Sequence, residues 1–364
     1  MNKQDKNILI VGAGPSGLSA AIFLSELGFR PRIIDKLAEH TNHSKAFGVN
    51  PNTLTLFESS GITQRFLNNG RKCEAFNFWR WKDSKLILRN DLTKAKNKYP
   101  FVLVQSQADS ERILREEIES RNILLERNVS FEDLIFSDGK ANVKLNKENS
   151  VENYIADQVI GADGAHSDVR KKLGIEFGGH KYDKEWELYD MELEMPFNKN
   201  DAHFFVKEDG GIFMVRIKEN IWRIVGSSKD VLNNLPKGTQ KGQIFWSSKF
   251  RINNRLANHL QKENCTLIGD AAHVHSPIGG RGMNLGVEDA FILSKLISEN
   301  KQMNYQNIRR AYIKQTVRKI NVITQVLTGD SFLSSIARRI LPIGSMAAPL
   351  FMNNARKFAM GLDK

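Results

Sequence analysis

The stretch of sequence that decides the fold is NILIVGAGPSG, residues 7–17. It opens on a continuous apolar run, which is typical of a strand buried on both faces of a parallel sheet. A helical pattern follows the glycines and ends at Gly28, residues 31–34 indicate a second strand, and Asp35 closes that strand. The order of strand, glycine turn, helix and strand predicts a βαβ unit.

The three glycines of this unit follow the spacing G-x-G-x-x-G, and each meets a different physical requirement. Gly12 permits the tight turn, Gly14 lets a pyrophosphate approach the backbone, and Gly17 lets the helix pack against the strand. Asp35, 18 residues beyond Gly17, is placed to accept hydrogen bonds from an adenosine ribose. An ordinary glycine turn is the alternative for the triplet alone. With its flanking elements the triplet predicts dinucleotide binding, although the spacing does not distinguish NAD from FAD.

Two later stretches also run from a short apolar strand into a glycine turn. They are VIGADGAHSDVR, residues 159–170, and TLIGDAAH, residues 266–273. The second continues through HSPIGGRGMNLG, residues 275–286, into a helical pattern over residues 287–297. With these motifs the sequence resembles the class A flavoprotein monooxygenases, the para-hydroxybenzoate hydroxylase-like aromatic hydroxylases. The family fingerprints G-x-G-x-x-G, D-G-x-x-S-x-V-R and G-D-A-A-H followed by P-x-x-G-x-G-x-N all occur here, in the family's order.

The resemblance covers nearly the whole chain and implies an α/β fold. A Rossmann-like FAD-binding domain would carry an inserted β-sheet substrate domain, with helices at the C-terminal end. The implied FAD-binding domain is discontinuous and comprises residues 1–71, 106–176 and 262–300. Residues 72–105 and 177–261 would form the substrate domain, and residues 301–364 the C-terminal helical segment.

The resemblance also assigns residues to the cofactor. Pro277, Gly282 and Met283 would lie in a loop that polarises the flavin, and no side-chain nucleophile is needed. The full set of implied cofactor-binding residues is Gly12, Gly14, Pro15, Ser16, Gly17, Asp35, Lys36, Lys45, Ala46, Gln107, Asp163, Gly164, Gly269, Asp270, Pro277, Gly280, Gly282, Met283 and Asn284.

Some of these assignments have alternatives. Asp163 either supports a pyrophosphate, in a loop that the family shares between FAD and NAD(P)H, or caps a turn. Lys45 stands where the family usually has arginine, so it keeps the charge but loses bidentate geometry. Arg281 replaces the glutamine or leucine of many relatives. It is either a carboxylate anchor for the substrate, a solvated loop arginine or a pyrophosphate contact.

The segments between the motifs alternate as strands do. They are residues 76–81, 86–88, 188–195, 203–206, 211–217 and 221–225, with a hairpin turn at 218–220. Such a sheet would roof the flavin, and its candidate pocket walls are Trp79, Trp81, Phe204, Phe213, Met214 and Trp222. The alternative for any one of these is that it belongs to the core of the sheet. The residues predicted to contact substrate are Arg281, His275, Phe204, Phe213 and Trp222.

The activity implied by the resemblance is hydroxylation of an aromatic or polycyclic small molecule with NAD(P)H and O2, through a flavin C4a-hydroperoxide. One alternative is an FAD-dependent oxidoreductase of the same fold with other chemistry, such as a reductase, a dehydrogenase or a tetracycline-type antibiotic-inactivating enzyme. Another is a non-catalytic flavin-binding protein. Neither the substrate nor the oligomeric state can be predicted from the sequence.

Composition excludes several other classes. The chain has 364 residues with 41% hydrophobic and 26% charged residues, which are globular values. Its net charge of +12 is dispersed, so a nucleic-acid surface is not expected. Cys73 and Cys265 cannot form a disulfide framework, and the pair His273 and His275 lacks the further ligands that a zinc site needs. We therefore expect no metal site and a cytoplasmic location.

Two features at the ends of the sequence bear on membranes. Residues 1–10 read as the start of a strand and not as a signal peptide, and no apolar run is long enough to span a bilayer. Residues 305–327 and 332–358 form basic amphipathic helical patterns, which Pro342 and Pro349 interrupt. In the resembled family such helices pack across the two domains. Association with a membrane surface is the second interpretation.

Overall fold

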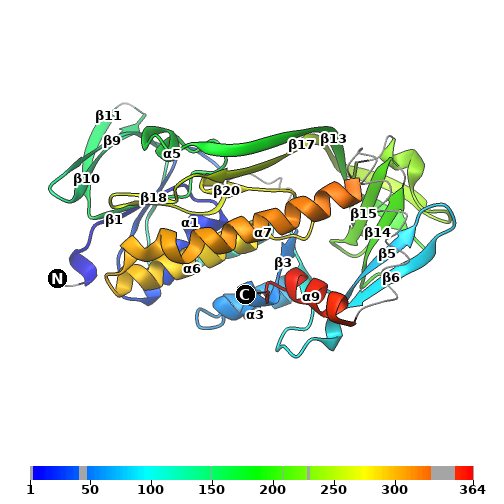
Figure 1. Ribbon diagram of the computed structural model, residues 1–364. Coiled ribbons are helices and arrows are strands. Elements are labelled where there is room, and N and C mark those ends of the chain that lie inside the picture. Colours follow the sequence, from blue (N-terminus) through cyan, green and yellow to red (C-terminus); the bar gives the residue numbers. More distant parts are fainter. Residues whose placement is uncertain are drawn as a thin grey trace.

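The computed structural model describes residues 3–40, 47–148, 150–207, 209–227, 230–328 and 349–363. Within these ranges the strands form two large sheets and two three-stranded sheets. The helices α6 (Gly282–Ser298) and α7 (Tyr305–Thr328) run alongside the sheets (Figure 1). The α/β fold predicted from the sequence is confirmed.

The first large sheet contains the predicted βαβ unit. Strand β1 (Ile8–Val11) pairs in parallel with β2 (Arg32–Asp35) on one side and with β12 (Gln158–Gly161) on the other. Strand β19 (Cys265–Leu267) extends the sheet in parallel beyond β12, and β8 (Leu125–Arg127) extends it beyond β2. Strand β18 (Gln261–Lys262) forms an antiparallel edge. The carboxyl ends of β1, β12 and β19 therefore lie side by side, and the three motifs follow those three ends.

Helix α1 (Pro15–Glu26) covers this sheet and is buried along most of its length, because it is apolar on nearly every side. It packs against α6 and against α4 (Gln107–Ser120). The shorter helices are α2 (Pro51–Leu56), α3 (Ile62–Asn69) and α5 (Asp168–Lys172), with 3-10 turns at Lys3–Asp5, Leu92–Lys94, Val231–Asn234, Gly269–Ala271 and Gln302–Asn304.

The second large sheet has the order β20-β17-β13-β16-β15-β14-β5-β6. Its strands are β5 (Ala75–Arg80), β6 (Lys85–Asp91), β13 (Phe177–Glu194), β14 (Ala202–Lys207), β15 (Gly210–Arg216), β16 (Ile221–Gly226), β17 (Gln240–Ala257) and β20 (His273–Val274). The long antiparallel strands β13 and β17 run from the neighbourhood of α5 to the far end of the molecule (Figure 1). The hairpin predicted at residues 218–220 joins β15 to β16 as expected.

The sequence interpretation missed two parts of this architecture. One is β17, and the other is the three-stranded sheet of β9 (Val129–Ser137), β10 (Lys140–Lys147) and β11 (Ser150–Ala156). The other small sheet joins β3 (Gly48–Val49), β7 (Val102–Val104) and β4 (Arg71–Cys73). Helix α9 (Pro349–Ala359) packs near β6. None of the helices within the described ranges has the length and apolar character needed to cross a membrane.

Candidate active site

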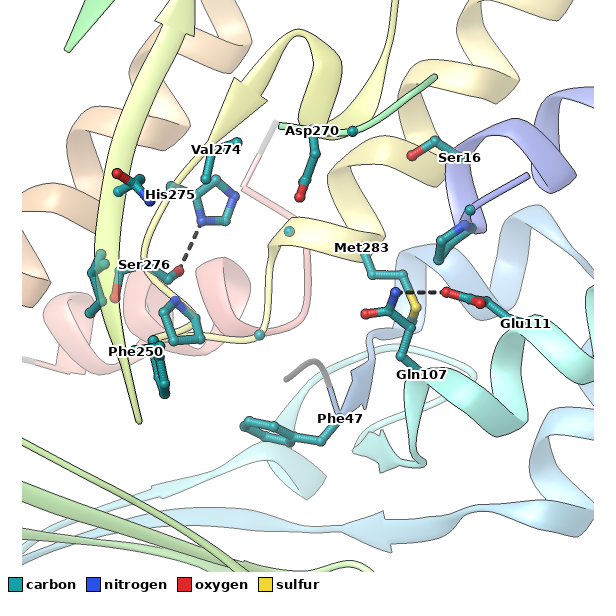
Figure 2. A pocket seen from close by; sticks show the side chains of 18 of the residues that line it. Ser16, Phe47, Gln107, Glu111, Phe250, Asp270, Val274, His275, Ser276 and Met283 are labelled. Carbon is teal, nitrogen blue, oxygen red and sulfur yellow. Dashed lines mark hydrogen bonds between the residues drawn. The ribbon is translucent and has the colours of Figure 1, made fainter. Parts of the chain in front are cut away.

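A cavity of about 440 Å³ opens where the ends of β1, β12 and β19 face strand β17. This volume is within the range of about 300–1,000 Å³ usual for small-molecule sites. Figure 2 shows Asp270 and Met283 pointing into it, with Phe47 and Phe250 on the other side. Its lining is Gly14, Pro15, Ser16, Phe47, Gln107, Glu111, Ala162, Gly164, Phe250, Arg251, Ile252, Asn253, Asp270, Val274, His275, Ser276, Pro277, Gly280, Gly282 and Met283.

The glycines of the first motif divide into two kinds. A Cβ placed on Gly17 would lie 1.9 Å from the carbonyl oxygen of Gly12, and one on Gly12 would lie 2.4 Å from the carbonyl oxygen of Ala162. These two glycines are required by contacts within the protein. A Cβ on Gly14 would meet no protein atom within 4 Å, although Gly14 lines the cavity. The space beside Gly14 is therefore open to a ligand.

Asp270 lies at the turn after β19, and its carboxylate is open to the cavity. Protein surrounds it closely enough that burial raises its pKa, while His273 lowers that pKa to a smaller extent. The turn is fixed from behind by the buried Asp289 of α6. One Asp289 oxygen accepts hydrogen bonds from the Gly269 amide at 3.2 Å and from the His273 ring at 2.6 Å. Arg309 of α7 donates to the other oxygen at 2.8 Å. The buried ion pair of Asp289 and Arg309 thus fixes Gly269 and His273, which lie before and after Asp270 in the chain.

The second motif supports the site indirectly through Asp163. One oxygen of Asp163 accepts hydrogen bonds from the amides of Asp168 and Val169, so the side chain caps α5. The turn-capping alternative is therefore realised, and burial raises the pKa of this carboxyl. Its other oxygen is buried without a partner among the described residues. Arg170 joins the second motif to the third by donating to the carbonyl oxygen of Ala271.

Helix α4 contributes two side chains to the cavity. Gln107, a predicted cofactor residue, donates to Glu111 at 2.7 Å (Figure 2). Burial raises the pKa of Glu111, and Arg115 lies 3.7 Å from its carboxylate. Glu111 is not among the cofactor residues predicted from the sequence, and its spacing of four residues from Gln107 on one helix face was the available signal.

The loop of residues 277–283, called the cavity loop below, separates β20 from the body of α6. Pro277, Gly280, Gly282 and Met283, which are predicted to bind the cofactor, line the cavity. Asn284 does not line it. Its amide donates to the carbonyl oxygens of Gly48 and Gly280 and accepts from the amide of Asn50, so it positions the loop.

His275 lines the cavity just before this loop. Its Nδ1 lies 2.9 Å from the carbonyl oxygen of Ser276, and since a carbonyl only accepts, Nδ1 carries the proton in the neutral ring (Figure 2). Burial lowers the pKa of His275 to about 4 against this hydrogen bond, with help from the charges of His273 and Arg281. His275 is therefore neutral at pH 7.

Arg281 corrects a prediction, because the structure does not place it as a substrate anchor. It is 2% exposed and does not line the cavity. Its guanidinium donates to the Tyr312 hydroxyl, the Phe358 carbonyl oxygen and the Asp363 carboxylate. A side chain buried to this degree is not the solvated loop arginine of the second alternative.

The predicted aromatic contacts also need correction. Trp222 is buried in a core cluster with Met191 and Phe205, and it does not line the cavity. Phe204 and Phe213 do not line the cavity either, and they pack against each other. Phe213 stacks on the cavity residue Phe47 with ring centroids 5.3 Å apart. The wall is formed instead by residues 250–253 of β17, a strand that the sequence interpretation missed.

Of the remaining predicted cofactor residues, those that the structure describes lie around the first motif. Asp35 accepts hydrogen bonds from the amides of Ala13 and Leu37, and Lys36 pairs with Asp168 at 3.2 Å. Gly269 packs against Ser16. Lys45 and Ala46 lie outside the described residues. Ribose binding by Asp35 stays a prediction.

Parallel strands that end in glycine turns around one cavity define a dinucleotide-binding protein of the α/β class. A family profile described as an FAD binding domain matches residues 5–234 and 228–319. The chain belongs to this FAD-binding family.

Two curated relatives show the range of the similarity. Pentachlorophenol 4-monooxygenase of Sphingobium chlorophenolicum is 30% identical over 311 residues, which are 79% of this chain and 57% of the relative. 6-Methylpretetramide 4-monooxygenase of Streptomyces rimosus is 26% identical over 364 residues, which are 95% of this chain and 64% of the relative. The chain therefore spans about three fifths of the length of these relatives.

Solved structures share the fold. The p-nitrophenol 4-monooxygenase of Pseudomonas putida superposes with a TM-score of 0.86 at 19% identity and covers 99% of both chains. An aklavinone-11 hydroxylase in a ternary complex with FAD and aklavinone has a TM-score of 0.78 at 17% identity, over 92% of this chain and 71% of that one.

The residues present fit an FAD molecule. The space beside Gly14 and the N-terminus of α1 suit a pyrophosphate, because orphan amides and the helix dipole favour negative charge there. The Asp270 carboxylate is an acceptor for hydroxyl groups, and the start of α6 at Gly282 and Met283 presents backbone amides at the same cavity.

Proposed function

We propose that this chain is an FAD-dependent monooxygenase that uses NAD(P)H and O2 to hydroxylate an aromatic or polycyclic small molecule. The observation that carries the proposal is the convergence of three distant motifs on one cavity, at Gly14, Gly164, Asp270 and Gly282. The names of the curated relatives, which act on a chlorinated phenol and a methylpretetramide, favour substrates of this chemical class.

In this proposal, residues at the ends of the parallel strands would hold the FAD molecule. Gly14 and Ser16 border the pyrophosphate, Asp35 accepts from the adenosine ribose, and Asp270 accepts from the ribityl hydroxyls. The amides at Gly282 and Met283 would donate to the flavin pyrimidine carbonyl, because a helix N-terminus stabilises negative charge. We also propose the domain division predicted from the sequence, in which residues 72–105 and 177–261 form a substrate domain that interrupts the FAD-binding domain.

Bound FAD supplies a centre that accepts two electrons from NAD(P)H and delivers them to O2. The overall reaction is NAD(P)H, a proton, O2 and the substrate going to NAD(P)⁺, water and the hydroxylated product. The chain's own contribution is to bind, orient and exclude water. The apolar side chains of Phe47, Phe250, Ile252 and Pro277 provide a dry wall for an aromatic ring, and the neutral His275 adds no charge to it.

The test begins with the purified protein. We expect it to be yellow, to consume NAD(P)H with a suitable phenol or polycyclic compound, and to give a product heavier by one oxygen atom. A colourless protein that takes up no added FAD would refute the proposal. Asp270→Ala should release FAD, whereas Asp83→Ala, at an exposed turn between β5 and β6, should retain it.

A further inference from the structure

Arg281 is placed at an unusual junction in the cavity loop. Its neighbours Gly280 and Gly282 line the cavity, but its own side chain does not line it and is buried. Arginine is rarely buried without a specific set of partners, because desolvation of its charge is costly. The partners therefore indicate what the side chain does.

Those partners come mainly from residues 356–363, called the latch segment below. This segment is docked on the body of the protein independently of Arg281. Arg356 donates to the Asp91 carbonyl oxygen at 2.7 Å, and Met360 is fully buried against Leu92 and Val102. The latch segment is therefore held in place by contacts that do not involve Arg281.

The latch segment reaches the cavity loop at two points. The Phe358 ring lies beside Gly279, where a Cβ would come within 3.6 Å of it, and the Arg281 guanidinium sits over the same ring at 5.0 Å. Asp363 pairs with Arg281 at 3.0 Å and with Lys319 of α7 at 2.9 Å. The carboxylate of Asp363 thus ties the loop both to the latch segment and to α7.

We propose that the latch segment fixes the cavity loop for the flavin, and that Arg281 is the positioning residue through which it acts. Asn284 restrains the same loop from the inside, through its bonds to Gly48, Gly280 and Asn50. With Arg281 held on the outside, the amides of Gly282 and Met283 keep one position. The flavin part of this inference rests on the proposed function, but the loop restraint does not.

The charge of Arg281 also reaches the cavity, since it contributes to the lowered pKa of His275. Exchange of Arg281 for glutamine should therefore loosen the cavity loop and remove a positive charge near the flavin. Exchange of Asp363 for asparagine should loosen the loop while leaving that charge in place. The two variants separate the mechanical effect from the electrostatic effect.

The experiment measures hydrogen exchange of residues 277–283 and FAD affinity in the full chain. Asp363→Asn should speed exchange of the loop and weaken FAD binding roughly tenfold, the loss expected for about one charge-assisted hydrogen bond. Lys314→Met is the control, because Lys314 is an exposed lysine of α7, whereas Lys319 itself pairs with Asp363 and lies over the Phe358 ring. It should change both quantities by less than twofold. The double variant Arg281→Gln/Asp363→Asn should exchange no faster than Arg281→Gln alone, and Arg281→Gln should also lower the flavin midpoint potential.

Two results would overturn the inference. One is an unchanged exchange rate of the loop in Asp363→Asn, and the other is additive effects in the double variant, which would mean that Asp363 does not act through Arg281. Thermal unfolding of each variant shows whether its structure is lost in general. If Arg281→Gln loses its structure, Arg281→Lys, which keeps the charge, replaces it in the exchange experiment. If the wild-type chain fails to bind FAD, the proposed function fails, while exchange of the loop still tests the latch.

Discussion

The two sides of the cavity are built in different ways. On the side of the parallel sheet, the lining consists of backbone turns and glycines at the ends of β1, β12 and β19, together with Asp270. On the opposite side, the lining includes Phe47 and the consecutive side chains 250–253 on β17. The first side is constrained by the close approach of backbone to backbone at Gly12 and Gly17, and it leaves open space beside Gly14. The second is constrained only by packing, so its residues can change with the substrate.

The sharpest test of this difference lies within the glycine motif. Gly17→Ala places a methyl group 1.9 Å from the Gly12 carbonyl oxygen, so it should destabilise the protein by about 3 kcal/mol or more, or prevent folding. Gly14→Ala meets no protein atom and should change the free energy of unfolding by less than about 1 kcal/mol. It should nevertheless weaken FAD binding at least tenfold.

Thermal unfolding of the apoprotein and titration with FAD measure the two effects. If both glycine variants lost the same stability, or if Gly14→Ala bound FAD like the parent, the separation of packing glycines from ligand-facing glycines would be wrong.

The support behind Asp270 gives the next effect. Asp289→Asn removes the charge that holds the Gly269 amide and the His273 ring, and breaking such a buried pair typically costs about 3 kcal/mol. FAD affinity should fall with it. Glu288 pairs with the same Arg309 at 3.1 Å, so Glu288→Gln is the matched control. It should lower stability but retain FAD better than Asp289→Asn does. Equal loss of FAD in both variants would show that Asp289 has no special relation to the turn.

His275 predicts a pH effect on the same side of the cavity. Its folded-state pKa of about 4 lies below the ordinary value of 6.5, so between these values the unfolded chain binds a proton that the folded chain does not. Stability of the apoprotein should therefore fall as the pH decreases from about 6.5 to 4, by on the order of 3 kcal/mol from this residue. Denaturant unfolding across this range should show a shallower pH dependence for His275→Gln. His259→Gln, at an exposed position, should keep the parent profile.

The smallest effect is expected on the β17 side. Arg251→Met changes an exposed side chain of the wall and should leave the free energy of unfolding within about 0.5 kcal/mol. FAD affinity should change by less than twofold, because the cofactor is proposed to lie on the other side. Loss of FAD comparable with that of Gly14→Ala would remove the distinction between the two sides.

The same distinction explains what could be predicted from the sequence. The glycines, Asp270 and the α/β fold were predictable because their constraints are local and repeat with fixed spacing. Arg281 was not, since its partners Tyr312, Phe358 and Asp363 lie 31 to 82 residues away. Strand β17 was missed although Ile244, Trp246, Phe250 and Ile252 alternate along it. That alternation was the usable signal, whereas the burial of Trp222 away from the cavity has no local signature.

The order of strands in the parallel sheet has a consequence for synthesis of the protein. Strand β1 leaves the ribosome first, but its neighbour β12 is about 150 residues behind it and β19 follows roughly another hundred residues later. Pairings between such distant segments form slowly, and domains complete only after all their parts have emerged. In the proposed flavin site, which includes the start of α6, a nascent chain can bind FAD only after α6 has emerged. A shortage of riboflavin, from which FAD is made, should accordingly lower the FAD occupancy of completed chains and leave their rate of elongation unchanged.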